Sequence, residues 1–161
     1  MIDIVSIQNH LERDLETAVA EANRAFSGER VIANIDSVVK RRTAKGQFLE
    51  GSSTKGYSRG HAKEREKKGL GTKKVDLFFS GEMLSATRGE VEADGTGLTI
   101  RYGYLAESEA DATRIAEYHN VLGAGKAKVI RRFLGLTGDE ETKIVENAQR
   151  DYGKTLKKAI G

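Results

Sequence analysis

The residues best suited to catalysis are few and scattered in this sequence. The three histidines, His10, His61 and His119, lie far apart, and none has a second histidine four residues away, as a helix-borne zinc site requires. Cysteine is absent, which excludes disulfides, thiolate metal sites and thiol nucleophiles. His119 is the one histidine near an expected core face, and a lone histidine is more often a hydrogen-bonded structural residue than a general base. We therefore expect no catalytic, cofactor-binding or metal site, and no enzyme activity.

One glycine-rich segment resembles part of a phosphate-binding loop. Gly125 and Lys126 match the last glycine and the lysine of that motif. The required first glycine is replaced by Asn120, however, and Ala127 occupies the Ser/Thr position. The motif is therefore incomplete, and we do not expect a nucleotide site of this kind.

Charge is distributed unevenly along the chain. The net charge is +3, but Lys40 to Lys74 contains twelve Lys or Arg residues and three acids, so this segment carries +9 and the remainder −6. Such a segment can bind nucleic-acid phosphates, or it can pair with acidic surfaces on neighbouring protein copies. Glu64 and Glu66 interrupt the basic run, aromatic residues are few, and no helix-turn-helix, RRM or KH pattern is present. These features favour a protein partner over nucleic acid.

The first half of the chain predicts two helices followed by a loop. Apolar residues at helical spacing predict a helix over residues 4–26, with Gly28 as its stop, and a second over 29–42 that folds back antiparallel to it. Residues 43–60 are rich in Gly, Ser, Thr and Lys, and residues 62–68 could form two helical turns. We call residues 43–74 the basic arm. A loop of this length tends to become ordered on a partner, and Phe48, Leu49 and Tyr57 could anchor it.

The segment after the basic arm is expected to attach it to the fold. Val75 to Phe79 has the composition of a short buried strand, and Ser80 resembles the N-cap of a helical turn through Ala86. The residues expected to anchor the arm are Val75, Leu77, Phe79, Met83 and Leu84. Beyond them, residues 90–93 and 98–104 flank Asp94-Gly95-Thr96-Gly97 and predict a β-hairpin.

The C-terminal part predicts two more helices. Ser108 and Asp111 have capping-box spacing for a helix to Leu122, and Thr137 and Glu140 have it for a last helix to about Ile160. Residues 126–136 between them should be extended. Together these elements predict one α+β domain over residues 1–161. An N-terminal helical hairpin and C-terminal helices would pack on a small, mostly antiparallel sheet that carries a long basic Gly-rich loop.

No stretch approaches 18 uncharged apolar residues, and the acidic N-terminus lacks a signal-peptide pattern, so neither a membrane span nor export is expected.

Short motifs occur in a characteristic order along the chain. They are Arg41-Arg42, Gly46-Gln47-Phe48-Leu49, Gly56-Tyr57-Ser58, Lys68-Gly69, Val75-Asp76-Leu77, Ser80-Gly81, Met83-Leu84, Tyr118-His119 with Gly123, and Arg131 to Leu136 with Asp139-Glu140-Glu141. In this order the chain resembles the tail-completion and virion-morphogenesis proteins of tailed bacteriophages, over residues 29–144. It departs from the family pattern at His61-Ala62-Lys63, where a second tyrosine is common, and at Arg132, where a proline is common.

The resemblance implies a structural virion protein of the neck or tail terminus, assembled in the bacterial cytoplasm. It implies a homo-oligomeric ring, sixfold or twelvefold, that completes the tail or joins it to the head. The implied partners are the chain itself, the adjacent connector, tail terminator or tail tube proteins, and non-specifically the DNA in the lumen. The candidate interface residues are Arg41, Arg42, Lys45, Phe48, Leu49, Tyr57, Arg131, Arg132, Phe133 and Leu134. The alternative from a different class is a basic nucleic-acid-binding accessory protein.

Overall fold

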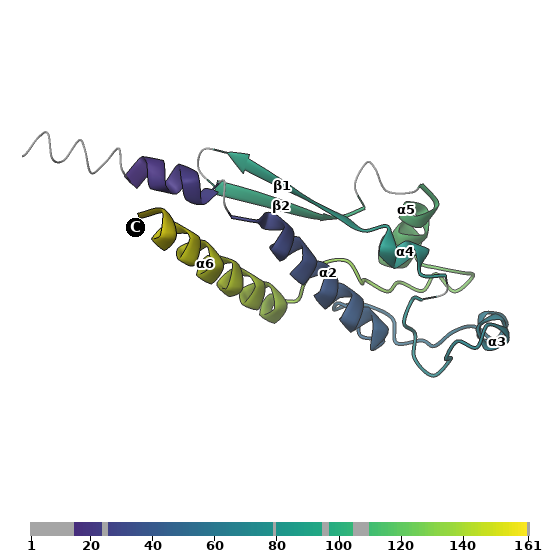
Figure 1. The fold of residues 1–161 in the computed structure, drawn as a ribbon. Helices are drawn as coiled ribbons and strands as arrows, with labels where there is room; N and C mark the ends of the chain where they lie inside the picture. The colour runs from purple at the N-terminus through teal and green to yellow at the C-terminus, as the bar shows by residue number, and fades with distance from the viewer. Residues whose placement is uncertain (1–14, 24–25, 79, 95–96, 105–109, 161) are drawn as a thin grey trace, which may run out of the picture.

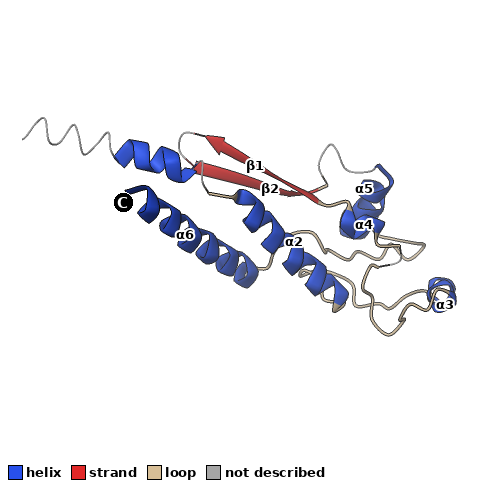
Figure 2. Cartoon of the chain, viewed as in Figure 1, coloured by secondary structure: helices blue, strands red, loops and turns tan. Residues whose placement is uncertain are grey.

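The computed structural model describes residues 15–23, 26–78, 80–94, 97–104 and 110–160. These residues form an α+β fold of helices and one antiparallel two-stranded sheet (Figure 1). After a helix at residues 15–23, the elements are α2 (Gly28–Ala44), α3 (Arg59–Lys67), α4 (Glu82–Ser85), β1 (Arg88–Asp94), β2 (Gly97–Gly103), α5 (Ala110–Glu117), the π-helical turn η1 (Tyr118–Leu122) and α6 (Gly138–Ile160). Figure 2 shows long loops on either side of α3.

Helix α2 lies at the centre of the molecule and confirms the predicted helix over residues 29–42. Gly28 does not stop the preceding helix; it lies in the first turn of α2 and is buried against the sheet. A methyl group at Gly28 would lie 2.8 Å from Cγ1 of Val91, and one at Gly89 would lie 2.6 Å from Cγ1 of Ile32. The two glycines therefore allow α2 and β1 to approach closely.

The predicted hairpin is confirmed. Strands β1 and β2 pair antiparallel, with Val91 opposite Ile100 and Arg88 opposite Gly103. The alternation along β2 gives Tyr102 and the following Tyr104 one common side, and both pack against the core. The hairpin thus packs against α2. The residues that join α4 to β1 lie next to the core.

The core is small and joins segments from the whole chain. Its buried residues are Val39, Met83, Leu84, Ala116 and Phe133. Phe133 and Val39 are fully buried. Phe133 belongs to residues 123–137, the segment between η1 and α6 that we call the connector. The connector therefore packs against α2. Met83 and Leu84 lie in the core as expected for anchor residues, and Leu77 packs against it half-buried.

The antiparallel neighbour of α2 is α6 (Figure 1), whereas the sequence predicted the N-terminal helix in that place. The described part of that helix, residues 15–23, continues in the general direction of α2. Aromatic contacts explain this arrangement. Phe26 packs edge-on against Tyr152 of α6, with ring centroids 5.7 Å apart, and the Tyr152 hydroxyl donates to Asn23 Oδ1 at 2.8 Å. The chain before α2 is therefore held along α6; residues 1–14 lie outside the described part.

The strand predicted at Val75–Phe79 does not form over residues 75–78, and Phe79 lies outside the described residues. Leu77 adopts a left-handed φ of 53°, which no strand tolerates. The Asp76 carboxylate accepts the backbone N–H of Phe78 at 2.9 Å and so turns the chain. Helix α4 follows as predicted, but Gly81 occupies its N-cap position.

The other C-terminal predictions are largely confirmed. Helix α5 continues into η1 and ends at Gly123 as expected, and the predicted capping box opens α6. Ser108 of the first predicted capping box is outside the described residues. The predicted extended connector begins instead with a tight turn, since Ala124 and Val129 pair across residues 125–128.

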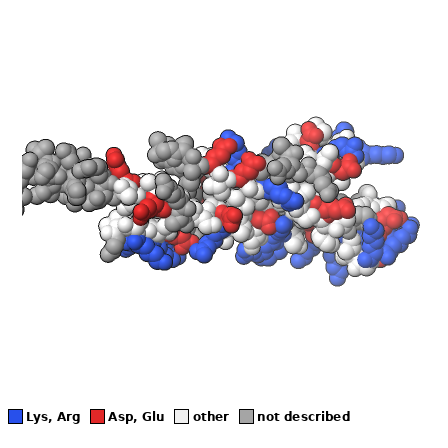
Figure 3. All heavy atoms as spheres, turned by 45° about the horizontal axis from the view of Figure 1, so that its top comes forward, with Lys and Arg blue, Asp and Glu red and all other residues white. Residues whose placement is uncertain are grey.

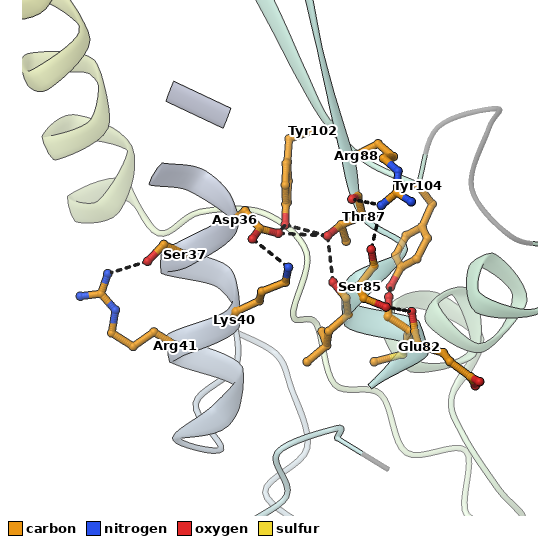
Figure 4. Close-up of polar contacts among 12 residues, drawn as sticks. Asp36, Ser37, Lys40, Arg41, Glu82, Ser85, Thr87, Arg88, Tyr102 and Tyr104 are labelled. Atoms are coloured by element: carbon orange, nitrogen blue, oxygen red, sulfur yellow. Dashed lines mark hydrogen bonds and ion pairs between the residues drawn. The ribbon is translucent and has the colours of Figure 1, made fainter. Parts of the chain in front are cut away.

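A polar cluster ties α2 to the sheet and α4 (Figure 4). The Tyr102 hydroxyl donates to Asp36 Oδ1 at 2.8 Å, and Thr87 Oγ1 lies 3.1 Å from the same oxygen. Lys40 forms an ion pair with Asp36 at 2.8 Å. Burial opposes ionisation of Asp36, but hydrogen bonds from Lys40, Tyr102 and Thr87 and the charge of Lys40 hold its pKa below the usual value. Burial, with Asp36 beside it, raises the pKa of Tyr102.

Candidate functional site: the basic arm and its supports

The base of the basic arm is fixed by a buried arginine. Arg42, in the last turn of α2, has a side chain only 7% exposed and forms an ion pair with Glu140 at the start of α6. Nη1 makes this ion pair, and Nη2 donates to the backbone oxygens of Phe133 at 2.7 Å and Gly135 at 2.8 Å. Glu140 also accepts the N–H of Thr137 at 2.9 Å, completing the capping box. One side chain thus joins α2, the connector and α6.

The first half of the basic arm is bonded to the connector. The N–H of Leu49 donates to Arg132 O and that of Ser53 to Ile130 O, both at 2.8 Å. The buried Arg131 guanidinium donates to Lys55 O at 2.7 Å. Residues 45–58 form no strand. These individual hydrogen bonds therefore hold this irregular segment against the connector.

The second half of the basic arm is organised around Arg65 of α3, whose side chain is 1% exposed. Its guanidinium forms an ion pair with Asp76 at 3.0 Å, donates to Gly71 O at 2.8 Å and lies 4.4 Å from the centre of the Tyr57 ring. The Tyr57 hydroxyl donates to Asp76 Oδ1 at 2.9 Å. Burial of this hydroxyl, with Asp76 beside it, raises the pKa of Tyr57. The cluster fixes α3 relative to residues 71–78.

Nine of the twelve basic side chains from Lys40 to Lys74 are exposed. They are Arg41, Lys45, Lys55, Arg59, Lys63, Lys67, Lys68, Lys73 and Lys74. Figure 3 shows a large group of Lys and Arg, with some acids among them, at the end of the molecule that carries α3, and further Lys and Arg along the lower edge of the view. The excess of positive charge that the sequence predicted is therefore a property of one end of the surface.

A hollow of about 420 Å³ opens in this basic surface. Residues 45–56 form most of its wall and residues 73–75 the remainder. Lys45, Lys55, Lys73 and Lys74 line it, and Glu50 is the one acid in the lining. We call this feature the lysine hollow. It is suited to hold an anion rather than to carry out acid-base chemistry.

The predicted interface residues fall into three groups. Arg41, Lys45 and Arg132 are exposed and available to a partner. Phe48, Leu49, Tyr57 and Leu134 are half-buried within the chain. The third group, Arg42, Arg131 and Phe133, is buried, and this corrects their assignment as interface residues, because their partners lie in this same chain. The sequence offered no local signal for the burial of Arg42, since Glu140 lies 98 residues away.

The histidine that the sequence singled out is not arranged as a catalytic base. Burial lowers the pKa of His119 to about 4, and the positive charges of Arg131 and His61 act in the same direction. Its Nδ1 is buried and has no hydrogen-bond partner among the described residues. No group of three or more His, Cys, Asp or Glu in the described part of the chain could hold a metal ion. His119 is thus neutral at pH 7, and no carboxylate among the described residues is hydrogen-bonded to its Nδ1.

No protein-family model, curated protein or solved structure matches this chain. None of the helices within the described residues has the length and apolar character needed to cross a membrane.

Proposed function

We propose that the chain is a structural virion protein of a tailed bacteriophage, located at the neck or tail terminus. In this proposal it forms a homo-oligomeric ring, sixfold or twelvefold, that completes the tail or joins it to the head. It performs no catalysis, and its neighbours are further copies of itself and the connector, tail terminator or tail tube proteins. The observation that carries the proposal is the ordered set of short motifs between Arg41 and Glu141.

The fold supports the proposal because motifs far apart in the sequence meet in space. Arg42 of the first motif bonds the backbone of Phe133 and Gly135 in the last one. Tyr57 likewise bonds Asp76, 19 residues away. Met83 packs in the same buried cluster as Phe133.

Exposed apolar side chains support the association of several copies. Ile115, Tyr118, Val121 and Leu122 lie on α5 and η1 and are 45%, 44%, 64% and 47% exposed. Tyr118 is three residues from both Ile115 and Val121 and four from Leu122, so the four side chains lie on or beside one face of the helix. Apolar patches of this kind typically mark contacts between proteins. A charge at Val121 should therefore disturb association without disturbing the core.

Affinity capture tests this proposal. The tagged full chain is expressed in bacteria producing the phage that encodes it, and captured proteins are identified by mass spectrometry. We expect connector, tail terminator or tail tube proteins to be enriched. Val121→Asp should reduce their enrichment, whereas Gln149→Asp, which adds the same charge at an exposed position of α6, should not. Capture of none of these proteins by a chain that also stays monomeric would overturn the proposal.

A further inference from the structure

The lysine hollow has a strong excess of positive charge that the chain itself does not neutralise. Lys45, Lys55, Lys73 and Lys74 are all exposed. Within the described residues, none of the four forms a salt bridge. Like charges gathered around one concavity repel each other, and this repulsion is relieved when an anion enters.

The wall of the hollow is held in place by contacts behind it. Leu49 and Ser53 are bonded to the connector, as described above. Gly46 has a φ of 71° and lies close to residues 73–75, which form the other wall of the hollow. A methyl group added to Gly46 would be 3.1 Å from Val75 O. The exposed Arg132 lies against Gly51, since its Nη1 would be 3.0 Å from a methyl group there. A fifth cation therefore lies beside the lysine hollow.

The lining chemistry distinguishes between two kinds of anionic partner. Contacts with proteins depend on aromatic, Met and Arg anchors, and lysine is depleted there. The lining contains four lysines and no arginine, and its aromatic residue, Phe48, packs against the core. Contacts with nucleic-acid backbones instead use Lys or Arg together with Ser and Thr hydroxyls and backbone N–H groups, and they need no aromatic anchor. Ser52, Ser53 and Thr54 supply hydroxyls in this wall.

We propose that the lysine hollow binds the phosphodiester backbone of nucleic acid, without reading its sequence. The aromatic residue of the lining, Phe48, packs against the core rather than standing free to stack, so the bases contribute little. The inference rests on the hollow alone and does not depend on the proposed place of the chain in a virion. It also reverses the preference for a protein partner that the sequence favoured for this segment.

The size of the electrostatic effect can be estimated. If four phosphates are neutralised, log K for duplex DNA should fall with log salt with a slope of about −3.6. Between 50 and 200 mM salt this is a loss of roughly 100-fold in affinity. Losing two lysines should reduce the slope by about 1.8.

Fluorescence anisotropy with a labelled random-sequence duplex tests the inference. We expect Lys73→Glu/Lys74→Glu to weaken binding at least tenfold and to flatten the salt dependence. Lys157→Glu/Lys158→Glu is the matched control, because it changes two adjacent exposed lysines of α6 by the same charge. The control should change the affinity less than threefold. Equal losses in the two variants, or no binding by the unmodified chain at 50 mM salt, would overturn the inference.

Two further measurements separate the alternatives. Inorganic polyphosphate should displace the duplex, whereas a poly-glutamate peptide of equal charge should compete poorly. Effective competition by poly-glutamate would assign the hollow to an acidic protein surface and refute the proposal. The oligomeric mass of Lys73→Glu/Lys74→Glu should equal that of the unmodified chain. A loss of mass would assign the hollow to a contact between copies instead.

Discussion

Replacing Arg42 with alanine removes a side chain that joins α2, the connector and α6. The change eliminates the ion pair with Glu140 and the two hydrogen bonds to the backbone oxygens of Phe133 and Gly135. It leaves the carboxylate of Glu140, 23% exposed, without its cation. The expected effect is on folding rather than on association with a partner.

The magnitude follows from the burial of the pair. Removing one partner of a buried ion pair costs about 3–5 kcal/mol, because the remaining charge is left uncompensated. A buried acceptor that loses its donor costs about 1–3 kcal/mol, but these terms are not additive within one network. We therefore expect a loss of about 3–5 kcal/mol for Arg42→Ala, which lowers Tm by roughly 6–20 °C in a chain of this size.

The assay is urea unfolding followed by far-UV circular dichroism, at one protein concentration for all variants. Arg41→Ala is the control, because Arg41 is exposed and bonds only locally to Ser37 at 3.2 Å; its cost should stay within about 0.5 kcal/mol. Glu140→Gln removes the charge but keeps an acceptor for the capping box. Combined with Arg42→Ala, it should give a coupling energy of at least about 1 kcal/mol.

If Arg42→Ala lowered the free energy of unfolding no more than Arg41→Ala, Arg42 would not hold these three segments together. An Arg42→Ala chain that unfolds normally but no longer associates would instead restore the interface role that the sequence predicted for Arg42.

Three further predictions concern the same fold. Gly89→Val should destabilise the protein by about 1–3 kcal/mol, since the new side chain meets Ile32, and Ile32→Ala in the same chain should recover part of that loss in thermal unfolding. His119 takes up a proton in the unfolded state near pH 6.5 but in the folded state only near pH 4. The free energy of unfolding should therefore fall, by up to roughly 3 kcal/mol, as the pH drops through this window. Urea titrations at several pH values should show this dependence, and His119→Leu should flatten it. Leu77→Asp should prevent cooperative unfolding by charging the edge of the core, whereas Lys55→Glu, on the exposed arm, should leave the unfolding midpoint unchanged within error.

The elements with strong local signals were predictable from the sequence. The hairpin follows from alternation on both sides of Asp94-Gly95-Thr96-Gly97, and the register of β1 and β2 agrees with it. Helix α6 follows from the spacing of Thr137 and Glu140, whose reciprocal hydrogen bonds are present at 2.9 and 3.3 Å. These signals involve residues close together in the sequence, so no knowledge of tertiary contacts was needed.

Features that depend on distant contacts were not predictable. Val75 to Phe79 has strand-forming residues, but Asp76 is held by Arg65 and Tyr57, and this tertiary cluster overrides the local preference. Arg42 follows two other cations at a helix end, where a solvated role is the ordinary expectation. Its burial depends on Glu140 and on two carbonyl groups that the sequence cannot place nearby.

The lysine hollow was predictable in its charge but not in its shape. The sequence identifies the basic run, but it cannot show that Lys73 and Lys74 face the same cavity as Lys45 and Lys55. The two walls approach each other at Gly46, where an added methyl group would lie 3.1 Å from Val75 O, and these residues are far apart in the sequence. The sequence offers phosphates only as one of two possible ligands, and the proposal that favours them rests on the residues that line the hollow.

The most direct test of the central claim is the mass of the purified full chain under native conditions, measured by native mass spectrometry over rising protein concentration. We expect a closed assembly with a mass six or twelve times that of the 17.6 kDa chain, and a shift to smaller species in Val121→Asp. A single species of 17.6 kDa at every concentration would contradict it.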